Sequence, residues 1–349
     1  MTGTGPSDGM LRMLVAVAAL VVVTAGLSVA STLLVPLVLA GFVALVSYPM
    51  VSWLERHRLP KWAAVSVTLA ALGTILIGPG LVVYGAATQF AAAVPRYRAR
   101  LGAMTIGWFE WLEAQGVDTS QIAEILNWAA VLDFAGGLFT SVAFLLSNAL
   151  LVLFIVAFVL MEAAGLPDHL CDAFQIDHAA LDRFRRVTGE VQGYLRIKTA
   201  VSLVTGLLVG LWAAFLDIDF AVLWGLLAFL LNYIPNFGSI MAAVPPVLLA
   251  LVQAGAGHAA GLAAGLMTIN LVFGYVVEPS LTGRQLQISP LVVVLSLSFW
   301  GWMWGPVGMV LAVPITMVIR ILAEHSPELR WVAVLLEGRT KVGGGDAPA

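Results

Sequence analysis

The side chains that could do chemistry in this sequence are polar residues placed inside long apolar runs. Asn232 and Asn236 flank Pro235, and Gly238 follows before the next apolar run begins. Proline has no backbone N–H, so it frees a carbonyl one turn earlier in a helix. Asparagine amides donate and accept hydrogen bonds, and broken helices in transporters present such groups to a polar solute. The alternative is that the two amides only satisfy the broken backbone.

Glu278 is the acidic side chain best placed for coupling to an ion. The pair Glu278-Pro279 closes an apolar run, and Arg284 follows a few residues later. A carboxylate beside an arginine at a helix end forms an interfacial ion pair, and in a transporter it can also exchange protons or cations. Asn270 lies inside the same run, where its amide can hydrogen-bond across helices. The sequence supports both roles for Glu278.

No enzymatic motif accompanies these residues. The sequence lacks His-Glu-x-x-His, the Gly-x-x-x-x-Gly-Lys-Ser/Thr phosphate loop and Gly-x-Ser-x-Gly. Its five histidines show no metal-ligand spacing, and its single cysteine, Cys171, cannot form an intramolecular disulfide. We therefore expect no catalytic residue, no metal and no cofactor, and any transport is passive or coupled to an ion gradient.

The composition indicates an integral membrane protein. The chain is 60% hydrophobic and 11% charged, with a mean hydropathy of +0.97. A soluble domain has about 25% charged residues. The net charge of −3 and the few basic residues argue against a nucleic-acid partner. The expected partners are the lipid bilayer and a small polar solute, or a monovalent cation or proton.

Apolar runs of about 20 residues predict the elements that position these side chains. The predicted spans cover residues 11–27, 33–51, 63–86, 138–161 and 199–216. Between them, 89–133 is too polar to span and predicts short external helices, one starting at Pro95 and ending at Gln115-Gly116. The expected divisions are 1–86 (first three spans), 87–137 (external helices), 138–198 (fourth span and a cytoplasmic amphipathic helix), 199–323 (transport core) and 324–349 (cytoplasmic tail).

Basic residues between the spans predict the orientation. Arg56, Arg58 and Lys61 lie between the second and third spans, and Arg196 and Lys198 belong to a second basic group before the fifth span. Short loops rich in Lys and Arg face the cytoplasm. Both termini are therefore expected to be cytoplasmic.

Two segments of the core are too long for one crossing. Residues 217–254 and 290–322 would measure about 57 Å and about 50 Å as continuous helices, against a hydrocarbon core of about 30 Å. The first is interrupted at 232–238 and the second at 301–308, which contains Gly305 and Gly308. Both second halves then contain Ala-Val-Pro.

These segments indicate an internal repeat of 199–254 and 258–322. If each broken segment is a hairpin that enters and leaves on one side, the two units have inverted topology, as in many secondary transporters. If each crosses once, Arg284 becomes external instead of cytoplasmic. We favour hairpins, because only a cytoplasmic Arg284 follows the positive-inside bias.

The broken segments resemble those of a known family. Asn232–Gly238 followed by Val244-Pro245 is similar to the signature region of the AI-2E transporters. Further similarity lies in Val277-Glu278-Pro279 with Gly283, in 288–291 and in 301–314. Asn236 departs from the glycine that often follows this proline, so substrate specificity does not carry over directly.

The resemblance implies a bacterial inner-membrane protein with about eight membrane segments. Some members of the family are linked to export of the signalling furanone autoinducer-2, and others to sodium(lithium)/proton antiport. It also implies a homo-oligomer, with a pentamer as the expected form.

The sequence therefore predicts an all-α, polytopic membrane protein with two broken or re-entrant helix pairs in its C-terminal half. From the resemblance we expect a secondary transporter that exports a small, autoinducer-2-like solute. The alternatives are a Na⁺(Li⁺)/H⁺ antiporter with Glu278 as the exchanging carboxylate, and a non-transporting scaffold that acts through its external helices. The expected pathway residues are Asn232, Pro235, Asn236, Gly238, Asn270, Glu278, Arg284, Gly305 and Gly308.

Overall fold

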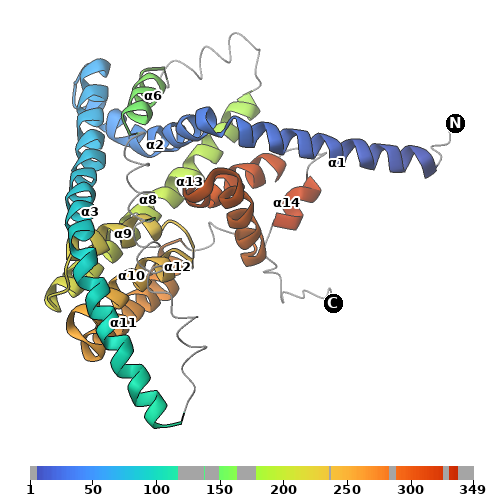
Figure 1. Ribbon diagram of the computed structural model, residues 1–349. Helices are drawn as coiled ribbons and strands as arrows, with labels where there is room; N and C mark the ends of the chain where they lie inside the picture. The colour runs from blue at the N-terminus through green and yellow to red at the C-terminus, as the bar shows by residue number, and fades with distance from the viewer. Residues whose placement is uncertain are drawn as a thin grey trace, which may run out of the picture.

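The computed structural model describes residues 6–116, 137, 149–162, 178–235, 237–282, 288–324 and 330–336. The regular elements in these ranges are helices (Figure 1). The N-terminal part contains α1 (Pro6–Val29), α2 (Ser31–Arg56), α3 (Lys61–Ala114) and α6 (Ala149–Glu162). The C-terminal part contains α8 (His178–Phe215), α9 (Ala221–Leu231), α10 (Phe237–Ala254), α11 (Ala256–Val272), the π-helix η1 (Phe273–Val277), α12 (Glu278–Thr282), α13 (Pro290–Glu324) and α14 (Arg330–Leu336).

Helix α3 is much longer than the predicted third span. It continues through Pro95, so the predicted helix start at that residue is wrong. Phe90 and Tyr97 are buried on either side of the proline and pack into the same apolar cluster, which holds the helix together across the lost hydrogen bond. The predicted end at Gln115-Gly116 is confirmed, because Gly116 has φ +79°. Figure 1 shows α3 running the length of one side of the protein.

Helix α8 joins two elements that the sequence divided at residue 198. The predicted surface helix and the predicted fifth span form one helix, without a proline to interrupt it. Val187, Val191 and Leu195 are buried at helical spacing before the expected boundary, and Val209 and Ala213 continue the buried positions after it. Lys198 therefore lies at a buried position inside a continuous helix, and the prediction that it belongs to a loop is wrong.

Helices α9 and α10 form a helical hairpin. The backbone N–H of Asp219 donates to Gln253 Oε1 at 3.0 Å, and the Gln253 amide donates to the Asp217 carbonyl at 2.9 Å. These bonds join the turn before α9 to the last turn of α10, so the two helices run antiparallel. At the tip, Gly238 approaches the Leu231 carbonyl so closely that a Cβ atom would not fit. The predicted break at 232–238 is confirmed.

Helix α13 also folds back on itself. Gly305 has φ 62° and ψ −147° in the middle of the helix. The Ser296 and Thr316 hydroxyls lie 2.6 Å apart, whereas a straight helix would separate these residues by about 30 Å. Gly308 faces the Trp300 carbonyl with no room for a Cβ atom. The predicted break at 301–308 is confirmed, with its pivot at Gly305.

Small residues allow the first hairpin to lie against α8. A Cβ atom added at Gly206 would lie 2.6 Å from the Gly225 carbonyl, and one added at Gly225 would lie 2.7 Å from the Gly206 carbonyl. The Gly206-x-x-x-Gly210 pattern thus packs against Gly225 of α9, as small-xxx-small patterns do in membranes. The tip of this hairpin then reaches α13, where Ile234 packs with Leu297 and Ala312.

The helices are long and apolar enough for a polytopic membrane protein. In the described ranges, six helices have the length and hydropathy to cross a membrane, and three shorter apolar helices accompany them. Large hydrophobic side chains on α3 and α11 are exposed, which suits contact with lipid. The predicted all-α membrane fold with two broken helix pairs is confirmed.

Candidate functional site

One face of α8 carries a row of buried polar side chains. Tyr194, Lys198, Ser202 and Thr205 are spaced by four, four and three residues, so they lie on the same side of the helix. Their exposed fractions are 3%, 3%, 0% and 2%, respectively. Polar groups at membrane depth are costly and therefore rare, and those that occur commonly mark a functional pathway, so this face is the candidate site.

Lys198 forms an ion pair with Glu278. The Lys198 Nζ atom donates to Glu278 Oε1 at 2.6 Å, and the Glu278 side chain is 19% exposed. Tyr194 is buried one turn before Lys198 on the same face of α8. Two opposite charges attract strongly in surroundings of low dielectric, but each loses its hydration, so both need their partner.

A change in helix type places Glu278 against α8. The π-helix η1 (Phe273–Val277) directly precedes Glu278, and both η1 and α12 pack against α8. A π-helical turn inserts an extra residue into the helical repeat and rotates the residues after it, and such turns occur often at functional sites. Pro279 comes next inside α12, so helix continues to Thr282 and does not close at Glu278-Pro279 as the sequence indicated.

The tip of the first hairpin binds the same face of α8. The Asn232 side-chain amide donates to Ser202 Oγ at 2.9 Å, and the Tyr233 hydroxyl donates to Thr199 Oγ1 at 2.8 Å. All four side chains are buried or half-buried. Asn232 therefore bonds across helices and does not merely satisfy its own broken backbone.

The second hairpin carries its own polar pair. Ser296 Oγ donates to the Ala312 carbonyl at 3.2 Å and also lies 2.6 Å from Thr316 Oγ1. These bonds connect the two legs of α13 below the pivot at Gly305. The two hairpins meet through Ile234, Leu297 and Ala312, with the partly buried Trp300 and Met309 alongside. The contact between them is apolar.

The structure brings together only some of the predicted pathway residues. Asn232 and Glu278 both contact α8, and Pro235 and Gly238 shape the turn that presents Asn232. Gly305 and Gly308 shape the fold of α13. Asn270 is half-buried in α11, where its backbone carbonyl accepts a hydrogen bond from the Phe273 N–H. Asn236 and Arg284 lie outside the described residues. Within the described residues, Glu278 pairs with Lys198, and the predicted pairing with Arg284 is not tested.

The sequence interpretation missed the residues of α8. Lys198, Ser202 and Thr205 were available as a pattern, since polar residues recur at helical spacing in an otherwise apolar run. Placing Lys198 in a loop hid that pattern. In the described part of the chain, no three His, Cys, Asp or Glu side chains gather as metal ligands would. The site offers one ion pair, hydroxyls and an amide, which suits binding and release rather than covalent chemistry.

Known proteins share this sequence over nearly its full length. A model of the AI-2E family transporters matches residues 16–328. The AI-2 transport protein TqsA of Escherichia coli is 37% identical over 95% of this chain and 97% of the relative. A Haemophilus influenzae protein named "Putative transport protein" is 33% identical over 93% of this chain and 96% of the relative. With its membrane-spanning helices, the chain is a membrane transport protein, and it belongs to the AI-2E transporter family.

Proposed function

We propose that this protein is a secondary transporter that exports a small polar solute of the autoinducer-2 kind. The observation that carries the proposal is the polar face of α8, whose buried side chains contact the tip of one hairpin and the charged end of another helix. Secondary transporters form their substrate sites with broken helices near the middle of the membrane, and the break between α9 and α10 contacts this face of α8. The AI-2 transport protein TqsA supports the choice of solute.

Neutral hydrogen-bonding groups at the tip suit such a solute. Ser202 with Asn232, and Thr199 with Tyr233, form two bonded pairs that can open and bond to hydroxyl groups of a passing molecule. Each pair loses one internal bond and gains bonds to the solute, so exchange costs little. Thr205 Oγ1 is buried without a hydrogen-bond partner among the described residues, and it extends the path by one turn.

Antiport of sodium or lithium against protons is the second candidate. The buried Lys198–Glu278 pair favours it, since ionisable groups inside membranes mark ion pathways and proton relays. In this version Glu278 is the exchanging carboxylate, and Lys198 occupies it when no cation is bound. The third candidate, a scaffold without transport, would give the buried polar face no role, and the names of the relatives favour transport.

The hairpins define the topology that this function needs. We propose that α9–α10 and α13 each enter and leave the membrane on one side, because the legs of α13 on either side of Gly305 are shorter than the about 30 Å core. The units 199–254 and 258–322 are then inverted repeats, and both termini are cytoplasmic in a bacterial inner membrane. The exposed apolar surface of α1 suits contact with neighbouring copies in a homo-oligomer.

Flux in proteoliposomes tests the proposal and separates its two versions. The purified chain is reconstituted with a pH-sensitive dye inside, and a sodium or lithium gradient or autoinducer-2 is applied. Export predicts autoinducer-2 flux that Glu278→Gln slows, without sodium-driven proton movement. If sodium drives proton movement and this movement is lost in Glu278→Gln, the protein is the antiporter. Glu162→Gln is the matched control, because Glu162 is exposed at the end of α6. Absence of any flux in the unmodified chain contradicts both versions.

A further inference from the structure

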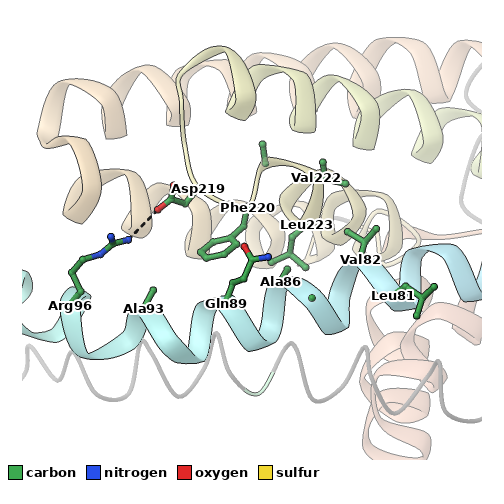
Figure 2. A pocket seen from close by; sticks show the side chains of 12 residues that line it. Leu81, Val82, Ala86, Gln89, Ala93, Arg96, Asp219, Phe220, Val222 and Leu223 are labelled. Atoms are coloured by element: carbon green, nitrogen blue, oxygen red, sulfur yellow. Dashed lines mark ion pairs between the residues drawn. The ribbon is translucent and has the colours of Figure 1, made fainter.

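A groove lies between α3 and the start of α9, and none of its lining residues belongs to α8. Its floor is one side of α3, and its other wall is the turn and first residues of α9. Figure 2 shows side chains from both elements pointing into it. The groove holds about 640 Å³, a size typical of small-molecule sites. Its lining residues are Leu81, Val82, Gly85, Ala86, Gln89, Ala93, Arg96, Asp219, Phe220, Ala221, Val222 and Leu223.

The two ends of the groove differ in chemistry. Leu81, Val82 and Val222 make one end apolar, and all three side chains are exposed. Gln89, Arg96 and Asp219 make the other end polar. Leu81 and Arg96 are about 22 Å apart along the helix, and half of a bilayer with its head groups is about 20–22 Å thick. The groove therefore has the length and polarity of one lipid in one leaflet.

The polar end of the groove carries a cationic side chain, Arg96, that can bind an anion. Asp219 Oδ2 accepts a hydrogen bond from the Tyr97 hydroxyl at 2.8 Å, while Arg96 Nη2 is 3.7 Å from the same oxygen. The Asp219 carboxylate is thus held by Tyr97, and the Arg96 side chain, 69% exposed, keeps donors for a second anion. Arg100 is exposed one turn further along α3, on the same side.

From this geometry we infer that the groove binds a phospholipid with an anionic head group. Its acyl chain lies along Leu81 and Val82 of α3 and Val222 of α9, and its phosphate binds Arg96 and Arg100. The wall helices belong to the apolar part of the chain, so the groove opens toward lipid. Arginine forks bind phosphate oxygens well, and each basic residue near a membrane surface strengthens the attraction to anionic lipid. The bound lipid would tie α3 to the start of the first hairpin.

Native mass spectrometry of the full-length protein tests this inference. The protein is stripped of lipid in detergent, and phosphatidylglycerol or phosphatidylcholine is added back. Retained phosphatidylglycerol should exceed phosphatidylcholine, and it should fall about fivefold for each arginine removed in Arg96→Gln and Arg100→Gln. Gly85→Leu should displace the lipid, because Gly85 lines the groove and a Cβ atom added there points into open space.

Gly102→Leu is the matched control. It makes the same change on α3, also into open space, but outside the groove, so it should retain lipid as the unmodified chain does. Equal retention of the two lipids contradicts the inference. So does a Gly85→Leu variant that holds phosphatidylglycerol as Gly102→Leu does. Loss of oligomers in Gly85→Leu with unchanged lipid would assign the groove to a second copy of the chain, which also overturns it.

Discussion

The Lys198 ammonium lies 2.6 Å from the Glu278 carboxylate, and it is almost completely buried. The pair joins the middle of α8 to the first residue after a π-helical turn. Removing one member of a buried ion pair leaves the other charged and unpaired, whereas replacing both with apolar groups can be neutral. This asymmetry makes the pair testable without knowledge of the transported solute.

Lys198→Met and Glu278→Leu should each destabilise the protein by about 3–5 kcal/mol as single substitutions. The double variant should recover most of that loss, because no unpaired charge is left inside the protein. Thermal unfolding in one detergent, followed by tryptophan fluorescence, measures the three variants against the unmodified chain. Losses that simply add in the double variant would mean that the two charges are not paired.

The bond between Asn232 and Ser202 should appear as a coupling energy. The double-mutant cycle of Asn232→Ala and Ser202→Ala measures it. Hydrogen bonds inside membrane proteins contribute about 0.6 kcal/mol on average and up to about 1.7 kcal/mol, so we expect a coupling energy in that range. Asn270→Ala combined with Ser202→Ala is the control, because the structure places Asn270 in α11 without a bond to Ser202. Equal coupling energies in the two cycles would contradict a specific contact between Asn232 and Ser202 at the hairpin tip.

Gly305→Ala should damage the second hairpin. The φ of 62° with ψ of −147° belongs to a region that almost only glycine adopts, and other residues lose about 1–3 kcal/mol there. Gly257→Ala in α11 is the control, since a Cβ atom there meets open space and alanine favours helix. The apparent melting temperature should fall for Gly305→Ala and stay level or rise for Gly257→Ala. The reverse order would contradict the proposed pivot.

A cysteine at position 284 should report the side on which the hairpins open. In a Cys171→Ser background, Arg284→Cys should react with an impermeant thiol reagent only from the cytoplasmic side, as measured in inverted and right-side-out vesicles. The reason is that hairpins return the chain to the side from which it entered, whereas single crossings move this position outside. Labelling only from outside would contradict the re-entrant arrangement while leaving the helical hairpins of the fold intact.

The breaks were predictable because their causes are local. Proline and glycine between Asn232 and Gly238, and glycine at 305, interrupt helices wherever they lie in the fold, and simple length showed that the segments could not be single straight spans. Pro95 shows the limit of that logic. Packing of Phe90 and Tyr97 around it keeps α3 continuous. Tertiary contacts of this kind cannot be predicted from the local sequence.

The candidate site was only half predictable for a related reason. Asn232 and Glu278 stood out as single polar residues in apolar runs. Their partners Ser202 and Lys198 are 30 and 80 residues away in sequence, and only folding brings them together. Lys198 also looked like an ordinary loop cation, because a positive charge near a span end normally marks the cytoplasmic side.

Access of water to α8 tests the central claim most directly. Thr205→Cys and Ala213→Cys, each in the Cys171→Ser background, place a thiol at two buried positions of the same helix. The proposed path passes Thr205, whereas Ala213 belongs to the apolar cluster. During transport in proteoliposomes, a water-soluble thiol reagent should modify Thr205→Cys and stop the flux, and Ala213→Cys should stay unmodified. If flux proceeds while both thiols remain unmodified, the solute does not move along the polar face of α8.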